Sequence, residues 1–111
     1  MSSVQVRIKV LRDALVSVAG GIVFHYFRPQ DTDRFVTWME DGEEDAFDAD
    51  NHKAEQTIHG TIHFFTNIEF DPLFDAIQDT LDNLSGVTYR WEVTTYEDDT
   101  RRIHTTWEWW M

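Results

Sequence analysis

Apolar side chains recur near the start of the chain at spacings of three and four residues. This stripe consists of Val4, Ile8, Leu11, Leu15 and Val18. Such spacing is typical of an amphipathic helix that buries one face. Ser2 with Gln5 three residues later can form a capping box, and Gly20-Gly21 can end the helix in a left-handed conformation. The pattern predicts a helix over residues 3–19.

The next part of the chain alternates between β-rich runs and polar turns. Residues 22–28 and 35–39 are β-rich, and Pro29 follows the first run, where it prevents extension of a central strand. Residues 55–66 then alternate with period two, which is typical of a half-buried strand. One face carries Ile58, Gly60, Ile62 and Phe64, and the other carries Thr57, His59, Thr61 and His63. Three strands are therefore predicted.

A second helical stripe follows Asp71-Pro72. Aspartate is a good N-cap and proline is a good first helical residue. The stripe consists of Leu73, Ile77, Leu81 and Leu84, with Phe74 beside it. Gly86 is the expected end of this helix, because glycine accepts the left-handed conformation at a helix C-terminus.

The rest of the chain alternates again and predicts a hairpin with strands near 87–96 and 101–110. A two- or four-residue loop would place Trp91 beside Thr106 on the core face. We therefore expect a loop of three or five residues with a bulge. Trp91 should then lie in the core, close to Trp107.

These elements predict a single domain over residues 1–111, a length that suits one hydrophobic core. The predicted order is helix, three strands, helix and two strands. The fold class is α+β, with an antiparallel sheet flanked by two helices that pack most simply on one face. The sequence shows no internal repeat and no domain boundary.

The charge of the chain narrows the choice of partners. Nine basic residues stand against 21 acidic ones, for a formal net charge of −12. Such a chain repels phosphate backbones and anionic membranes, so sequence-specific nucleic-acid binding is not expected. Two roles remain compatible with the charge. The protein can mimic DNA on another protein's basic site, or it can form a wall past which DNA slides.

A dense acidic run lies in the middle of the chain. Its members are Glu40, Asp41, Glu43, Glu44, Asp45, Asp48 and Asp50. Self-repulsion among these carboxylates predicts a mobile loop. The run lacks the EF-hand frame, so a solvated loop is expected rather than a calcium site.

The sequence offers little for catalysis. The absence of cysteine excludes disulfides, thiolate metal sites and cysteine nucleophiles. His59 and His63 have a metal-pair spacing, but on a strand they are about 13 Å apart, too far to share one ion. Nucleotide-binding glycine motifs and the nucleophile elbow are also missing. We therefore expect no enzyme activity, no cofactor and no metal.

Membrane spans and export are not expected either. No apolar run reaches the roughly 18 residues that a spanning helix needs. Arg7, Lys9 and Arg12 interrupt the apolar character near the N-terminus, unlike a signal peptide. The expected location is the cytoplasm.

Aromatic side chains exceed what one core face needs. Trp107, Trp109 and Trp110 nearly end the chain, and Trp110 points away from the other two. Further aromatics on faces that the pattern assigns as polar are Trp38, Phe65 and Tyr96. Two interpretations remain open: a surface for a partner protein, or a sheet end wrapped by the chain's own loops.

Three segments carry a family resemblance. They read ADNHKAEQTIHGTIHFFTN (Ala49–Asn67), FDPLFDAIQDTLDNL (Phe70–Leu84) and YRWEVTTYEDDTRRIHTTWEWWM (Tyr89–Met111). With the N-terminal helix and the acidic run, this order resembles small neck and tail-completion proteins of tailed bacteriophages and prophages, above all the tail terminator. The resemblance covers nearly the whole chain and carries no catalytic motif.

The resemblance implies a structural role in a virion. The family forms a ring, usually of six copies, that caps the head-proximal end of the tail tube, stops its polymerisation and docks the head connector. Implied partners are other copies, the tail tube protein and the head connector, while DNA only passes through the lumen. The implied location is the host bacterial cytoplasm during assembly and then the virion. Alternatives are a head-completion protein and a DNA mimic, although a mimic should spread its carboxylates rather than concentrate them.

A ring needs two different contact patches on each subunit. We expect one on the sheet face around His59, His63, Phe65 and Trp110. We expect the other on the exposed side of the first helix with the segment Tyr26–Arg34. Arg28 and Arg34 supply scarce positive charge in that segment. The acidic run Glu40–Asp50 is expected to face the lumen or the tube.

Overall fold

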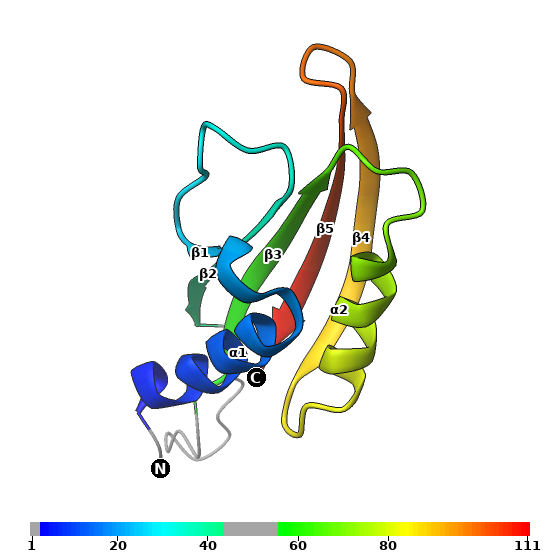
Figure 1. The fold of residues 1–111 in the computed structure, drawn as a ribbon. Coiled ribbons are helices and arrows are strands. Elements are labelled where there is room, and N and C mark those ends of the chain that lie inside the picture. Colours follow the sequence, from blue (N-terminus) through cyan, green and yellow to red (C-terminus); the bar gives the residue numbers. More distant parts are fainter. Residues whose placement is uncertain (1–2, 44–55) are drawn as a thin grey trace.

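The computed structural model describes residues 3–43 and 56–111 and confirms the predicted α+β class and element order (Figure 1). Its elements are α1 (Val4–Ala19), a short 3-10 turn η1 (Gly20–Ile22), β1 (Val23–His25), β2 (Phe35–Glu43), β3 (Ile58–Thr66), α2 (Pro72–Asp82), β4 (Thr88–Glu97) and β5 (Arg102–Trp110). Within the described ranges, no helix is both long and apolar enough to cross a membrane.

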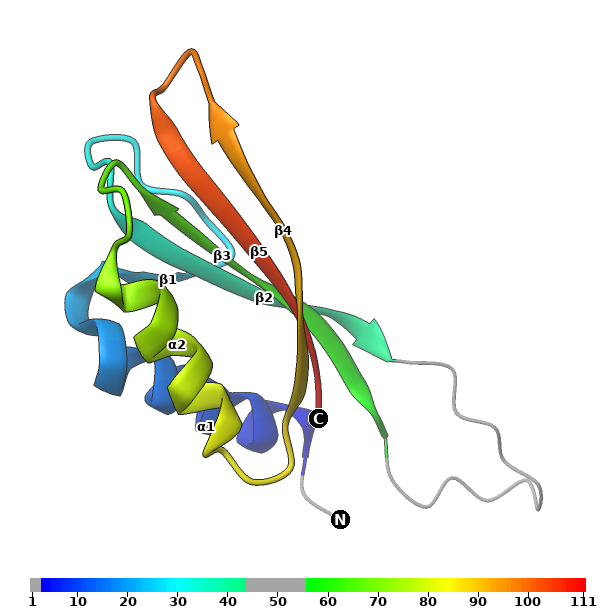
Figure 2. The same cartoon turned by 90° about the vertical axis from the view of Figure 1, so that its right-hand side faces the viewer.

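The five strands form one sheet in the order β1-β2-β3-β5-β4. All neighbours from β2 to β4 are antiparallel, as predicted, but β1 runs parallel to β2, so the sheet is mixed. A parallel connection must cross one face of the sheet. Figure 2 shows both helices on one face. The connecting segment Tyr26–Arg34 uses the opposite face, where Arg28 lies 4.5 Å from the ring centre of Phe65.

Local capping sets where the helices begin. Ser3 caps α1, one residue later than predicted, and its hydroxyl accepts a hydrogen bond from the Val6 amide. Asp71 caps α2 and Pro72 is its first residue, as predicted. The second helix ends at Asp82, before the predicted stop at Gly86.

The core lies between the two helices and the sheet face that they cover. Its buried members are Ile8, Leu11, Leu15, Val36, Trp38, Ile58, Ile62, Phe64, Leu73, Ile77, Leu81, Trp107 and Trp109. The assignment of Trp38 to a polar face is wrong. Both faces of β2 are apolar at its start, so alternation alone did not identify the inner one.

Trp109 packs directly over the backbone of Gly60, its partner on β3. A Cβ atom at Gly60 would come within 2.2 Å of both the Trp109 ring and the Met39 carbonyl oxygen. The indole Nε1 of Trp109 donates to the Thr61 carbonyl at 3.1 Å. The glycine is therefore required by close packing, and it lets the large ring lie flat on the sheet.

The final hairpin differs from prediction in its loop length and in the position of Trp91. Its loop has four residues, 98–101, rather than three or five. A bulge at Glu92 corrects the register, so Trp91 still faces Trp107. A bulge was predicted, and it lies inside β4. Because it shifts the register there, a loop with an even number of residues still brings apolar residues opposite one another. Trp91 itself is 54% exposed, because β4 is the edge strand, so its predicted core position is wrong.

The described part of the acidic run is strand rather than the predicted loop. Residues Glu40, Asp41 and Glu43 belong to β2, which extends past its predicted end through a bulge between Glu40 and Gly42. Pairing with β3 and hydrogen bonds to polar neighbours offset the repulsion expected of this run. Glu44, Asp45, Asp48 and Asp50 lie outside the described residues.

Candidate interaction surfaces

The sheet face away from the helices, here called the outer face, holds four of the predicted contact residues. His59, His63 and Phe65 lie on β3, and Trp110 lies opposite His59 on β5. The His59 and Trp110 rings are 5.3 Å apart between centres. The structure therefore places these residues on one face, as the alternation predicted.

Phe65, however, is fully buried inside the chain. Its ring stacks on Phe35 at 4.6 Å and on His104 at 4.1 Å between ring centres. Guanidinium groups of Arg28 and Arg102 lie 4.5 and 5.5 Å from the Phe65 ring centre. Phe65 and Arg28 thus hold the segment Tyr26–Arg34 against the outer face. A contact with a partner at Phe65 would require this segment to move.

Two histidines meet beside that cluster. The Nδ1 atom of His63 and the Nε2 atom of His104 are 2.8 Å apart, and the Thr106 hydroxyl lies 3.3 and 3.4 Å from them. Burial, then the charges of His104 and Arg28, lowers the pKa of His63 to about 4. Burial also lowers the pKa of His104, although Glu97 opposes this effect. Both rings are therefore neutral at pH 7, and one donates its N–H to the other.

Arg34 forms an internal ion pair. Its guanidinium donates to the Asp71 carboxylate at 2.7 and 2.9 Å, and the Asp71 side chain is 1% exposed. Asp71 also accepts hydrogen bonds from the Thr66 hydroxyl and the Leu73 amide. These contacts, that of Arg34 first, lower the pKa of Asp71 to about 2. The scarce positive charge at Arg34 is thus used within the chain.

The described part of the acidic run also makes internal contacts. Glu40 accepts hydrogen bonds from Tyr26 and from His25, the latter at 2.7 Å. Burial raises the pKa of Glu40, but the hydrogen bonds outweigh it, so the net shift is downward. Asp41 lies 3.5 Å from the His59 ring. At least these two carboxylates are held on the strand.

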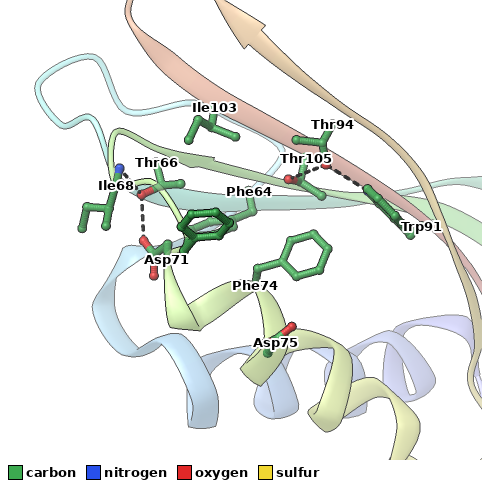
Figure 3. A pocket seen from close by; sticks show the side chains of 11 residues that line it. Phe64, Thr66, Ile68, Asp71, Phe74, Asp75, Trp91, Thr94, Ile103 and Thr105 are labelled. Carbon is green, nitrogen blue, oxygen red and sulfur yellow. Dashed lines mark hydrogen bonds between the residues drawn. The ribbon is translucent and has the colours of Figure 1, made fainter.

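A second surface, which the sequence did not reveal, lies between α2 and the β4–β5 hairpin on the helix side (Figure 3). It is an open groove of about 400 Å³, here called the aromatic groove. Its lining residues are Phe64, Thr66, Ile68, Phe70, Asp71, Phe74, Asp75, Trp91, Thr94, Ile103 and Thr105. Most of the wall is apolar, and Asp75 supplies an exposed carboxylate.

The rim of the groove carries two exposed aromatic rings, of which that of Trp91 is held by its neighbours. Phe70 is 91% exposed, in the loop before α2. Trp91 meets Phe74 edge to face, with ring centres 5.7 Å apart. Its Nε1 donates to the Thr94 hydroxyl at 2.9 Å, which also contacts Thr105 at 3.0 Å. The only sequence signal was the surplus of aromatics, which did not indicate where they gather.

The described residues contain no group of three or more histidines and carboxylates arranged to hold a metal ion. His59 and His63 lie on the same strand but have different partners. His59 lies beside Glu108 and Asp41, whereas His63 lies beside His104. The geometry is that of a scaffold with two candidate contact surfaces, the outer face and the aromatic groove.

Comparison with solved structures shows a likeness of fold. No family model matches the chain, and no curated protein matches it. A solved structure described as "Virion of native gene transfer agent (GTA) particle" contains a chain that superposes with a TM-score of 0.50. That chain is 16% identical, and the match covers 93% of this chain and 89% of the other. The likeness shows that the two chains share a fold over nearly their full lengths.

Proposed function

We propose that the protein is a structural component of a phage-like virion, with no enzymatic role. The observation that carries this proposal is the fold shared with a chain of a gene transfer agent particle over 93% of the sequence. The resemblance of the sequence to phage neck and tail-completion proteins points to the same class of particle. One argument rests on backbone geometry and the other on residue pattern.

Within such a particle, we propose the position of tail terminator. Copies of the chain would form a ring, of six in the family that the sequence resembles, between the tail tube and the head connector. The net charge of −12 supports this position, because DNA would pass an acidic lumen without adhering to it. The aromatic groove and the half-buried pair His59 and Trp110 on the outer face would supply surfaces for neighbouring subunits and for the tube.

The proposed partners follow from this position. They are other copies of the chain, a tail tube protein and a head connector, with DNA only in passage and no membrane. The proposed location is the cytoplasm of a bacterial host during assembly and the virion neck afterwards. His59 and Trp110 remain proposed contact residues, and the acidic end of β2 is proposed to face the lumen or the tube.

The observations support a DNA mimic less well. A mimic needs free carboxylates in rows at phosphate-like spacing. Asp71 and Glu40 are instead engaged with Arg34, and with His25 and Tyr26, inside the chain. A head-completion protein remains the second candidate, because it would need the same kind of surfaces.

Deletion of the coding sequence in the cell that encodes the particle separates these candidates. Without a terminator, tail tubes should grow beyond their normal length and heads should remain unattached. Without a head-completion protein, tails should keep their normal length while heads lose DNA. Normal particles in the deletion strain would contradict a virion role. Electron microscopy of the purified particles reads out all three outcomes.

A further inference from the structure

We infer that the aromatic groove of one copy binds the outward side of α1 of a second copy. The arrangement of these contacts in a ring rests on the proposed function. Every subunit would then offer its groove to one neighbour and its helix to the other. The groove, the helix and their charges carry the argument.

The groove is suited to an apolar segment that also carries positive charge. Phe70 and Trp91 present exposed rings, and Asp75 is exposed at the same rim. Aromatic faces attract cations, and a nearby carboxylate adds to that attraction. An exposed aromatic wall of this kind is also where interfaces place their energetically dominant contacts.

The outward side of α1 has the matching character. Val6, Val10 and Val16 are 55%, 46% and 45% exposed, although valine is usually buried. Lys9 and Arg12 are exposed beside them. On a helix, Val6 and Val10 are one turn apart and form a short apolar ridge with the cations along its flank. Within residues 3–43 and 56–111 this ridge stays exposed, because the opposite side of α1 is the one that packs on the core.

The two helices have opposite charge. The 16 residues of α1 include three basic residues and one acid, whereas the 11 residues of α2 include three acids and no base. Among the described residues, the ion pairs do not join α1 to α2. Asp75, the acid of α2 that lines the groove, is thus available to the cations of another copy. Basic residues are scarce in a chain of net charge −12, so the basic helix α1 of another copy is the expected binding partner for the acidic helix α2.

The positions of the two patches allow repeated assembly. Figure 1 shows α1 and β1 towards one flank of the molecule and α2 with β4 towards the other. A contact between different patches is head-to-tail, so it leaves one groove and one helix free at each end of a dimer. Such a contact closes into a ring when the rotation between subunits fits.

Cross-linking of mixed single-cysteine variants tests this contact directly, because the chain has no cysteine of its own. Val10→Cys and Ile68→Cys are both at exposed side chains, so neither should disturb the monomer, and Ile68 lines the groove without being one of its aromatic rings. Under mild oxidation at high concentration, the mixture should form disulfide dimers at least about tenfold faster than either variant alone, since docking raises the effective concentration to the millimolar range. Equal rates for the mixture and the single variants would overturn the inference.

Two further arms identify the occupant and the charge pairing. Val10→Cys mixed with Val93→Cys is the matched control, because Val93 is 42% exposed on the same hairpin but on the outer face. It should react only at the random rate. Adding Lys9→Asp to the first variant should slow the reaction, and adding Asp75→Lys to the second should restore it. Failure of the swap to restore cross-linking would contradict the charge pairing.

The result is independent of the deletion experiment above. Cross-linking without any effect of the deletion on particles would support the contact and contradict the virion role. A deletion phenotype without heterotypic cross-links would support the virion role and remove this contact.

Discussion

Arg34 and Asp71 are joined by two hydrogen bonds of 2.7 and 2.9 Å that tie the start of β2 to the N-cap of α2. The same carboxylate holds the Leu73 amide and the Thr66 hydroxyl. Asp71 also lines the aromatic groove, so this pair fixes the helix that forms one wall of the groove. The Arg34 guanidinium is therefore a structural clamp rather than a free surface charge.

The clamp should make stability depend on acid pH. The pKa of Asp71 is lowered to about 2, so its contribution is present above pH 4 and is lost as pH falls towards 2. The free energy of unfolding should lose roughly 2 kcal/mol over that range, since one pKa unit corresponds to about 1.4 kcal/mol. Urea denaturation at each pH measures it. The variant Asp71→Asn should lack this pH-dependent loss of unfolding free energy. An identical pH profile for both proteins would show that the clamp does not stabilise the fold.

Gly60 should tolerate no side chain. Gly60→Ala would force the Trp109 ring and the Met39 backbone to shift, so it should cost about 1–3 kcal/mol, the usual cost of overpacking. Gly21→Ala is the matched control, because a Cβ there meets nothing within 4 Å. Thermal unfolding compares the two variants. Equal melting temperatures would mean that Trp109 has room to move away from β3.

The two paired tryptophans of the hairpin should differ in their effect on stability. Trp107 is fully buried and its Nε1 donates to Gln78, so Trp107→Ala should cost about 3–5 kcal/mol. Trp91→Ala should cost about 1–2 kcal/mol, because Trp91 is already half exposed and loses little burial. Chemical denaturation of both variants provides the test. A loss at Trp91 as large as that at Trp107 would place Trp91 in the core after all.

The histidine pair of the outer face should give a second acid effect, at higher pH than that of Asp71. The pKa of His63 falls to about 4 in the folded state, so the unfolded chain binds more protons between pH 6.5 and 4. Stability should therefore decline by roughly 2 kcal/mol as pH falls through that window. The variant His63→Gln should show a flatter profile there. A profile as steep as that of the native chain would mean that other groups cause the decline.

The sequence was sufficient to predict the helices and strands whose patterns depend on near neighbours along the chain. The stripe Leu73, Ile77 and Leu81 with its cap at Asp71 led directly to α2, because capping and helical periodicity depend on near neighbours. Alternation likewise placed His59, His63 and Phe65 on one face of β3. Element order and fold class followed from these local patterns.

Features that depend on distant contacts were not predictable. Phe65 is buried because Tyr26–Arg34 crosses the outer face, and no local pattern gives the path of that segment. Trp91 is exposed because β3 pairs with β5 and leaves β4 at the edge. The aromatic groove combines residues from α2, its preceding loop and the hairpin, so it exists only after the sheet order is known.

The claim that this chain is a structural part of a phage-like virion is tested most directly by its copy number in purified particles. Quantitative mass spectrometry of particles from the encoding cell, normalised to the tail tube protein, provides that number. The account predicts a small, constant number of copies in each intact particle, retained after density-gradient purification. A chain that is abundant in the cells but missing from the purified particles would contradict it.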